Sequence, residues 1–307
     1  MERTRRDFLG LVATAAGIGL VAEHVDASVK SDPSQGLGVL VDTVVCIGCR
    51  KCEQACDREH DLANLPAESY NDKSVFTTQR RPDNESYTVI NQFASTESPD
   101  KTYTIKVQCM HCLEPACVSA CIVGALSKDP SGAVVYDAWK CIGCRYCMVA
   151  CPFQIPSYEY HDPFTPMVRK CTFCYERISV QGRNPACVAS CPNEALTFGK
   201  RRDLIDVAHA RIRQHPEKYV DHVYGEHEVG GTSWMYLSPL PFENVPLPAL
   251  GDTAIPPMTE RIQHNIFKSF IPPIALYGLL GLIMYTMKRE REYEKDGKPE
   301  DEREKIV

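Results

Sequence analysis

The sequence predicts an α+β fold in which one cysteine-rich unit is duplicated, a hairpin is inserted, and a single transmembrane helix follows near the C-terminus. Three observations lead to this prediction. The chain has 307 residues and contains 16 cysteines, which fall into four groups of four. These groups form an internal repeat, and a long uncharged run lies near the C-terminus. The length allows one or two packed domains with a substantial core.

Composition argues against two classes of protein. Lys and Arg number 34 against 40 Asp and Glu, for a net charge of −6, so no basic excess favours nucleic-acid binding. Hydrophobic residues make up 44% and charged residues 24%, which is ordinary for a folded chain and argues against disorder. The cysteine content leaves three explanations: disulfides, zinc sites or iron–sulfur clusters.

The N-terminus has the pattern of a signal peptide. Arg5 and Arg6 precede a Phe-Leu pair, and residues 10–22 are uncharged. A basic start, an apolar stretch and small residues near Ala27 are typical of export signals, and the Arg pair resembles a twin-arginine signal. We expect residues 1–27 to be this signal. A short buried helix is the alternative.

The uncharged run near the C-terminus covers residues 270–287, 18 residues in all. As a helix it would span about 27 Å, close to the roughly 30 Å of a hydrocarbon core. Basic residues follow at once, namely Lys288, Arg289 and Arg291. By the positive-inside rule they place the C-terminus in the cytoplasm. We expect a transmembrane helix at 266–287 and a cytoplasmic tail at 288–307, with a buried core helix as the alternative.

The cysteine groups have the spacing of iron–sulfur ligands. Group one is Cys46, Cys49, Cys52 and Cys56, and group two is Cys109, Cys112, Cys117 and Cys121. Group three is Cys141, Cys144, Cys147 and Cys151, and group four is Cys171, Cys174, Cys187 and Cys191. Groups one and three have the bacterial ferredoxin run C-x2-C-x2-C-x3-C, in which the fourth cysteine ligates the other cluster of a pair. We expect this fourth cysteine at the start of a helix, and Gly48 and Gly143 where the loop approaches the cluster.

Zinc and disulfides explain this spacing less well. Zinc sites use C-x2-C pairs, so a third cysteine two residues further on has no tetrahedral role. Disulfides are the natural alternative in an exported protein, but cysteines this close in a tight turn do not pair easily. Twin-arginine signals also export folded proteins, so clusters can be built first. A zinc- or disulfide-stapled scaffold that anchors a partner to the membrane is the alternative of another class.

The groups repeat in the order A-B-A′-B′. Residues 39–52 match residues 134–147 at an offset of 95, and residues 115–121 match residues 185–191. This is typical of a duplicated two-cluster unit. Groups two and three would form one compact ferredoxin-like unit, and groups one and four would pair around it.

Four 4Fe–4S clusters need 16 thiolates, which is the number the chain has. We therefore expect four ligand sets and no three-iron variant. Set 1 is Cys46, Cys49, Cys52 and Cys191, and set 2 is Cys171, Cys174, Cys187 and Cys56. Set 3 is Cys109, Cys112, Cys117 and Cys151, and set 4 is Cys141, Cys144, Cys147 and Cys121. Cys56 and Cys121 lack the proline that follows Cys151 and Cys191.

The remaining pattern predicts the other elements and the domain limits. We expect strands at 39–45, 133–136 and 195–198, and a helix at 202–213. Possible strands at 87–93 and 103–107 indicate an inserted hairpin suited to gripping a partner, or else a solvated loop. The outer unit would comprise 38–108 and 166–200, the inner unit 109–165, and an extension for partner contact 201–265.

Over residues 38–287 this pattern resembles the four-cluster ferredoxin-like subunits of membrane-bound respiratory oxidoreductases. Segments 224–226, 230–232 and 241–244, with the twin-arginine signal, resemble the iron–sulfur subunit of periplasmic uptake nickel–iron hydrogenases of the hydrogenase-2 type. The beta subunit of periplasmic formate dehydrogenase is also similar, in residues 230–237 and in its single C-terminal helix. That subunit usually travels on its catalytic partner's signal, so the Arg pair favours the hydrogenase.

The resemblance implies an electron-transfer subunit that is not an enzyme by itself. It would relay electrons through four 4Fe–4S clusters between a periplasmic catalytic subunit and an integral membrane quinone-binding subunit. Groups one and four would face the catalytic partner, and groups two and three the membrane. The protein would sit at the periplasmic face of the inner membrane, held by its C-terminal helix. A formate dehydrogenase or another quinone-linked molybdoenzyme complex is the alternative.

No other motif indicates substrate chemistry. His111 could tune a cluster from outside its ligand shell, or could be a partly exposed loop residue. His264 and Lys268 are expected to anchor the chain at the membrane interface or to lie near a quinone. The Trp234–Tyr236 segment is expected in the core or at a partner contact.

Overall fold

The fold is described from a computed structural model, over residues 36–63, 65–95, 101–162, 165–256 and 277–288. The expected signal peptide, His264, Lys268 and the tail beyond Lys288 lie outside these residues. The strands are β1 (Leu37–Asp42), β2 (Thr88–Ala94), β3 (Thr102–Gln108), β4 (Leu126–Lys128), β5 (Val134–Tyr136), β6 (Ser157–Tyr158), β7 (Val168–Arg169), β8 (Leu196–Lys200) and β9 (Trp234–Leu237). The α-helices are α2 (Lys51–Glu59), α3 (Ala116–Ser119), α4 (Tyr146–Ala150), α5 (Tyr175–Ser179), α6 (Ala186–Ala189) and α7 (Arg201–Gln214). The 3-10 helices are η2 (Ala67–Asn71), η3 (Ser74–Thr77), η4 (Ala138–Lys140), η5 (Glu228–Gly230) and η6 (Phe242–Asn244).

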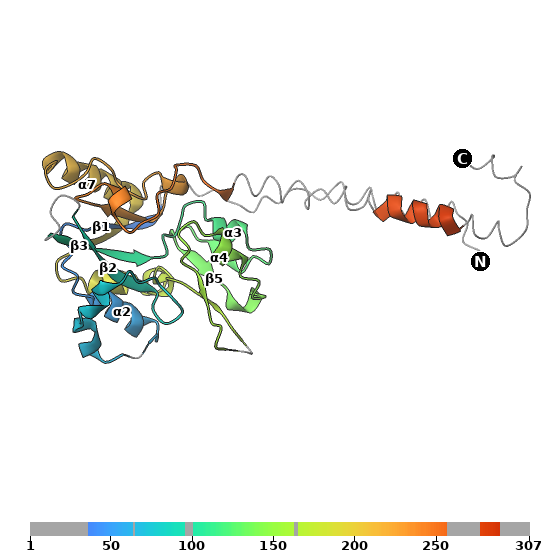
Figure 1. Cartoon of the computed structure of the whole chain (residues 1–307), viewed down its shortest axis with the longest axis horizontal. Helices are drawn as coiled ribbons and strands as arrows, with labels where there is room; N and C mark the ends of the chain where they lie inside the picture. The colour runs from blue at the N-terminus through green and yellow to red at the C-terminus, as the bar shows by residue number, and fades with distance from the viewer. Residues whose placement is uncertain (1–35, 64, 96–100, 163–164, 257–276, 289–307) are drawn as a thin grey trace, which may run out of the picture. The chain divides into compact units, whose positions relative to one another are not determined.

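A three-stranded sheet with the order β8-β1-β9 organises one end of the fold. β1 pairs antiparallel with β8 and parallel with β9. Helix α7 packs against β1 and β8 (Figure 1). It buries Leu204 and Ala208 against Leu40 of β1, while the alternate residues Val39 and Val41 belong to the main core on the other face.

Helix α7 and strand β9, which both lie after residue 200, are part of this core. In the segment that the sequence indicated as an extension for partner contact, α7 covers the sheet and β9 forms its edge beside β1. All four residues of β9 are at most 1% exposed. Of the two expectations for Trp234–Tyr236, the structure therefore selects the core.

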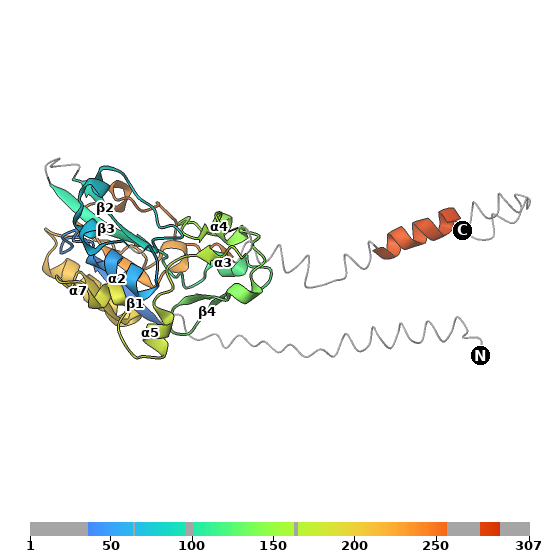
Figure 2. The same cartoon turned by 90° about the horizontal axis from the view of Figure 1, so that it is seen from below.

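The β4–β5 hairpin repeats the local geometry of the β8–β1 pair. The Asp42 amide donates to the Ala195 carbonyl at 2.8 Å, and the Asp137 amide donates to the Ala125 carbonyl at 2.8 Å. Each aspartate then accepts backbone amides from the loop that follows it, at Oδ1. Equivalent residues in the repeat thus make equivalent contacts. The two copies are neighbours (Figure 2), since the Leu37 amide at the start of β1 donates to the Ser131 carbonyl in the β4–β5 turn at 3.1 Å.

The inserted segment forms a hairpin that packs inside the protein. β2 and β3 pair antiparallel, with Thr88 opposite Gln108 at one end of the hairpin and Ala94 opposite Thr102 at the other. Ile90 is 1% exposed and Ile105 is fully buried. The alternative of a solvated loop is therefore wrong, because both strands contribute side chains to the main core.

The helices place the cysteines differently from the expectation. Cys52 and Cys56 both lie within α2, and Cys151 follows the last residue of α4. The fourth cysteine therefore ends a helical turn, and the expectation that it starts a helix is wrong. The reason is that Arg50 (φ 62°) and Arg145 (φ 60°) reverse the loop immediately before each helix, so the third cysteine falls in the first turn.

The observed limits of the other predicted elements differ only at their ends. The predicted helix 202–213 is α7, and the predicted strands at 39–45, 133–136 and 195–198 are β1, β5 and β8. β1 ends at Asp42 rather than at residue 45, because the Asp42 carboxylate accepts the amides of Val44 and Val45 and turns the chain.

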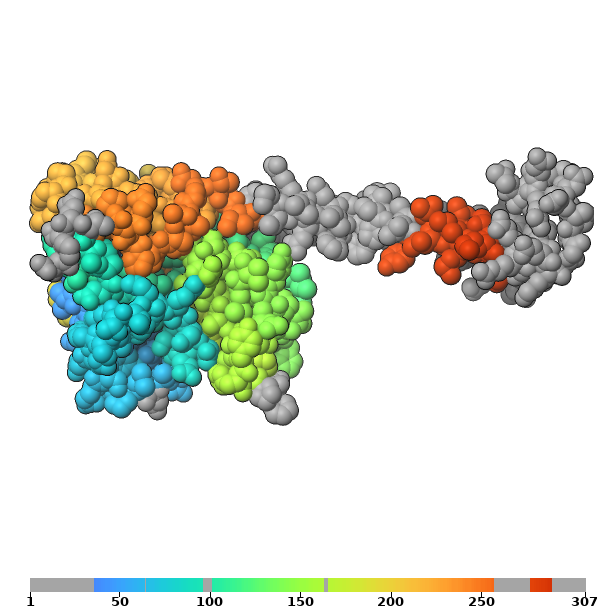
Figure 3. Space-filling view, in the orientation of Figure 1, coloured from blue at the N-terminus to red at the C-terminus, as the bar shows by residue number. Residues whose placement is uncertain are grey.

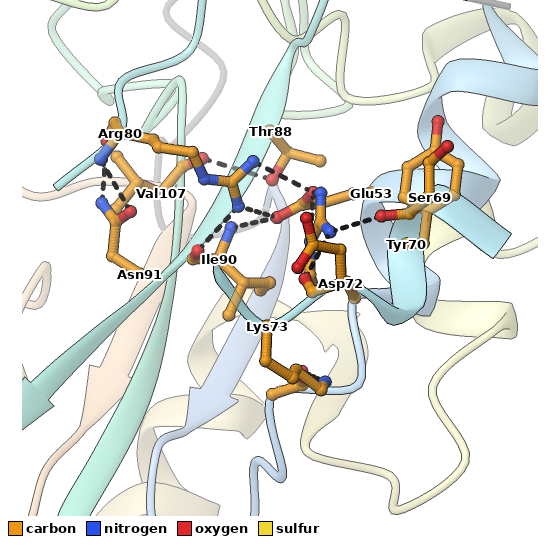
Figure 4. Close-up of polar contacts among 12 residues, drawn as sticks. Glu53, Ser69, Tyr70, Asp72, Lys73, Arg80, Thr88, Ile90, Asn91 and Val107 are labelled. Atoms are coloured by element: carbon orange, nitrogen blue, oxygen red, sulfur yellow. Dashed lines mark hydrogen bonds and ion pairs between the residues drawn. The ribbon is translucent and has the colours of Figure 1, made fainter. Parts of the chain in front are cut away.

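A buried carboxylate ties α2 to the inserted segment (Figure 4). Glu53 is 3% exposed and accepts hydrogen bonds from Arg50 at 2.8 Å, Arg80 at 2.5 Å and the Ile90 amide at 2.5 Å. Arg50 also donates to the carbonyl of Ser69 in η2 and to the carbonyl of Asp72, the residue that follows η2. Lys73 donates to the Gly48 carbonyl at 2.6 Å. The inserted segment therefore supports the loop of group one.

Residues 277–288 form a helix whose side chains are exposed. Its apolar residues include Tyr277 at 73% and Met284 at 70% exposure. Within the described part of the chain, no helix has the length and apolar character needed to cross a membrane. The first half of the predicted span at 266–287 lies outside the described residues.

Replacing Glu53 by Ala should destabilise the fold, because Arg50 would keep a buried charge without its carboxylate partner. Breaking such a pair costs about 3 kcal/mol or more, and each kcal/mol lowers the melting temperature by about 2–4 °C in a domain of this size. Thermal denaturation of the whole protein checks this. Glu68→Ala, at an exposed acid of η2, is the control and should leave the midpoint unchanged. Equal midpoints for Glu53→Ala and the wild type would contradict the role of the network.

Candidate iron–sulfur centres

The loops of groups one and three have the same backbone turn. Gly48 and Gly143 adopt φ values of 64° and 69°, in the left-handed region that glycine tolerates. A Cβ at Gly48 would stand 2.8 Å from the Thr104 side chain, and one at Gly143 would stand 2.6 Å from the Tyr158 hydroxyl. Glycine is therefore required by the turn and by these neighbouring side chains.

Set 1 lines one pocket. Cys46, Cys49 and Cys52 from the first loop and Cys191 from group four face it together. Burial raises the pKa of the Cys46 thiol, a hydrogen bond from Thr104 lowers it, and the nearby Cys191 and Cys49 thiolates raise it further. The structure therefore brings Cys191 to group one across 145 residues of chain.

Set 2 gathers around the second cysteine of α2. Burial raises the pKa of Cys56 well above its ordinary value, and the thiolates of Cys171, Cys187 and Cys174 raise it further. Helix α2 packs against α6, which carries Cys187. Cys56 therefore lies with group four, away from the first loop of its own group.

Sets 3 and 4 gather in the inner unit, where α3 packs against α4. In set 3, burial raises the pKa of Cys112 strongly, with further contributions from Cys109, Cys151 and Cys117. In set 4, burial and then the thiolates of Cys141, Cys121 and Cys144 together raise the pKa of Cys147 to about 11. The cysteines assigned to each set from spacing are thus electrostatic neighbours in the structure.

The chemistry of these sets fits an iron–sulfur cluster. All sixteen cysteines are free thiols. Buried thiolates that repel one another need a cationic centre to remain deprotonated, and a metal cluster supplies it. Among the described residues, no group of three or more His, Cys, Asp or Glu side chains is arranged to hold a single metal ion.

The sets follow one another in a row. One cysteine in each of the first three sets shows this. Burial is the largest cause that raises the pKa of its thiol, and a thiolate of the next set raises the pKa further. These pairs are Cys52 with Cys187, Cys171 with Cys109, and Cys117 with Cys147. These electrostatic neighbours link the expected sets in the order set 1, set 2, set 3, set 4.

Set 4 reaches the surface among apolar side chains. Cys144 is exposed, and Trp139 is 96% and Val149 82% exposed. We call this surface the set 4 patch, and its residues are Ile122, Trp139, Ile142, Tyr146 and Val149. The inner unit that carries it forms its own lobe, green in Figure 3.

His111 is fully buried, so the expectation of a partly exposed loop residue is wrong. Its Nδ1 accepts the Val134 amide at 2.8 Å. Burial lowers its pKa well below the ordinary value, and the charges of Lys170 and Lys128 lower it further. The imidazole serves as a packing and hydrogen-bonding group beside group two, with its ring centre 5.0 Å from the centre of the Phe173 ring.

Sequence reasoning missed three lysines whose amines lie inside the protein. Lys106 is 1% and Lys170 4% exposed. Lys170 donates to the carbonyls of Val134 and Cys171, and Lys128 donates to the carbonyls of His111 and Gly132. Nothing in their local sequence indicated burial, because lysine is normally a surface residue.

Comparisons with known proteins agree with this geometry. Residues 101–201 match the family model of a 4Fe–4S dicluster domain. A protein of Nitratidesulfovibrio vulgaris is 50% identical over 246 residues, which is 78% of this chain and 65% of that protein. Hydrogenase-2 operon protein HybA of Escherichia coli O157:H7 is 34% identical over 93% of this chain and 96% of its own length. The nitrate-inducible formate dehydrogenase iron–sulfur subunit of Escherichia coli K12 is 32% identical over 86% of this chain and 89% of its own.

The crossing of Cys56 into set 2 is testable by pairs of serine substitutions. If Cys56 and Cys171 bind one cluster, the double variant Cys56→Ser with Cys171→Ser should lose the iron of one cluster. The matched pair Cys49→Ser with Cys171→Ser should lose the iron of two. Iron and sulfide analysis of protein purified without oxygen distinguishes these results. Loss of two clusters from the first pair would contradict the crossing.

Proposed function

The chain belongs to the family of iron–sulfur subunits that includes HybA and the formate dehydrogenase iron–sulfur subunits, and we propose that it is the electron-transfer subunit of a hydrogenase-2-type complex. The chain is not the catalytic subunit. Its electrons would pass between a nickel–iron hydrogenase and an integral membrane quinone-reactive subunit.

The observation that carries this proposal is the row of four thiol sets. Clusters bound there would supply reversible one-electron chemistry. The residues of this chain hold the sets together through the α2–α6 and α3–α4 contacts, and eight of the sixteen cysteines are buried. We call the bound clusters 1 to 4 after their sets.

The hydrogenase is favoured over formate dehydrogenase by two observations. HybA matches a larger share of both chains than the formate dehydrogenase subunit does. The second observation is the Arg5–Arg6 pair. It gives this subunit an export signal of its own, whereas the formate dehydrogenase subunit usually depends on the signal of its catalytic partner. A formate dehydrogenase or another quinone-linked molybdoenzyme complex is the second candidate, supported by the 32% identity.

We propose that clusters 1 and 2 lie on the side of the catalytic partner and that cluster 4 faces the membrane subunit. The set 4 patch supports this orientation, because large apolar side chains in water favour a protein or membrane contact. The duplicated ferredoxin-like units, the export signal at 1–27 and the membrane helix at 266–287 are parts of the same proposal. They would place the protein at the periplasmic face of the inner membrane.

The function is tested on the intact membrane complex, purified without oxygen. Its visible spectrum should bleach under hydrogen and should not change with formate, because electrons from the catalytic subunit reduce the clusters. Bleaching by formate alone would identify a formate dehydrogenase subunit and overturn the hydrogenase assignment. If neither hydrogen nor formate bleaches the spectrum but a chemical reductant bleaches it fully, both proposed catalytic partners would be ruled out. The assignment of four clusters would stand. A colourless protein would favour the stapled scaffold.

The orientation is tested at the set 4 patch. The double variant Trp139→Glu with Val149→Glu should lower hydrogen-dependent quinone reduction at least about tenfold, since a charge buried in the contact easily costs the ~1.4 kcal/mol that tenfold requires. Hydrogen-dependent reduction of a soluble dye should stay unchanged. Val180→Glu, at an equally exposed apolar residue outside the patch (80%), is the matched control. Normal quinone reduction in the double variant would contradict this orientation.

A further inference from the structure

Lys106 is a buried cation in the core of the outer unit. It lies in β3 and is 1% exposed. Its Nζ is 3.0 Å from Oε1 of Gln108 and 4.4 Å from the centre of the Trp234 ring. Both contacts are to uncharged groups. None of the ion pairs found in the described parts of the chain includes Lys106.

A closed set of hydrogen bonds holds this amine in place. Gln108 donates from Nε2 to the Tyr236 hydroxyl at 2.7 Å, and that hydroxyl donates to the Lys106 carbonyl at 2.9 Å. Because Nε2 of Gln108 is bonded to Tyr236, the side-chain oxygen Oε1 is the atom of Gln108 that contacts Lys106. The side chain therefore cannot move toward solvent without breaking the contacts between β3 and β9.

Burying an ammonium group without a carboxylate is costly, so some other negative charge must compensate. Burial lowers the pKa of Lys106, but the thiolates of Cys187, Cys52, Cys171 and Cys56 raise it above its ordinary value. Lys106 lines the same pocket as Cys46, Cys49, Cys52 and Cys191, the four cysteines of set 1. Of the four thiolates that raise its pKa, Cys52 belongs to set 1 and the other three to set 2. The counter-charges of Lys106 are thus divided between two neighbouring sets.

We propose that Lys106 is a fixed positive charge that raises the reduction potentials of clusters 1 and 2. When such a cluster accepts one electron, its net charge becomes more negative by one, and a nearby cation stabilises this reduced form. Lys106 keeps its proton throughout, so the step transfers an electron and no proton. This inference rests on the proposed ligand sets and adds to them the residue that makes the first half of the row easier to reduce.

The experiment is a potentiometric titration of the purified complex, followed by electron paramagnetic resonance. Lys106→Met removes the charge and keeps the length of the side chain. Lys106→Gln removes the charge and keeps a polar group beside Gln108. Lys106→Arg keeps the charge and can still stack on the Trp234 ring. Lys101→Met is the matched control, because Lys101 is an exposed lysine preceding the same strand, with its amine 5.2 Å from the Tyr103 ring centre.

In both neutral variants, two of the four cluster potentials should fall. We expect at least a tenfold change in the ratio of reduced to oxidised cluster at a given potential, which is 59 mV for one electron. Lys106→Arg and Lys101→Met should keep the wild-type potentials. A shift in Lys106→Arg as large as that in Lys106→Met would overturn the proposal, because the charge would then not be the cause. Unchanged potentials in both neutral variants would overturn it as well.

Iron and sulfide analysis of each sample separates this inference from the proposed function. Wild-type protein with fewer than four clusters would contradict the proposed function itself. Four clusters with unshifted potentials in the neutral variants would contradict only the role of Lys106. If Lys106→Met assembles poorly, Lys106→Gln provides the same comparison.

Discussion

The antiparallel pairing of β1 with β8 is the interaction on which the rest of the structure depends. Val41 of β1 pairs with Leu196 of β8. Cys46 lies five residues after Val41, and Cys191 five residues before Leu196. Because the strands are antiparallel, the C-terminal end of β1 lies beside the N-terminal end of β8. The loop that leaves β1 therefore meets the chain that enters β8. Group one is therefore next to group four, although the inner unit separates them in the chain.

The cost of this arrangement is electrostatic, since it gathers many thiolates in a dry interior. Each thiolate raises the pKa of its neighbours, so the apoprotein favours neutral thiols at these sites. Lys106 offsets part of this repulsion, because its charge lowers the pKa of Cys52 and Cys171. Clusters bound at these sites would supply the remaining positive charge, so we expect cluster assembly to be coupled to folding.

The two halves of the repeat have diverged in how they meet their surroundings. The outer unit is covered by α7 and by the inserted segment that Glu53 holds to α2, and β9 closes its sheet. In the inner unit, the equivalent loop of group three leaves Cys144 and the set 4 patch exposed. Both ends of the row reach the surface: Cys46, Cys49 and Cys191 of set 1 are partly exposed, and Cys144 of set 4 is exposed among the larger apolar surface of the set 4 patch.

The sequence by itself determined the features that depend on short spacing. The intervals within each cysteine group set the loops, and the 95-residue offset revealed the repeat. The strands beside the loops and the hairpin at β2–β3 were also predictable from local patterns. These features are local, so covalent geometry and backbone preferences suffice to predict them.

Only the tertiary structure decided which polar groups are buried. Lys106, His111 and Glu53 each have contacts with segments distant in the chain, and no local pattern distinguishes them from surface residues. The same holds for β9, whose apolar residues suited a partner contact as well as a core. The physical reason is that burial of a side chain depends on which distant surfaces fold over it, and those surfaces are brought together by strand pairing.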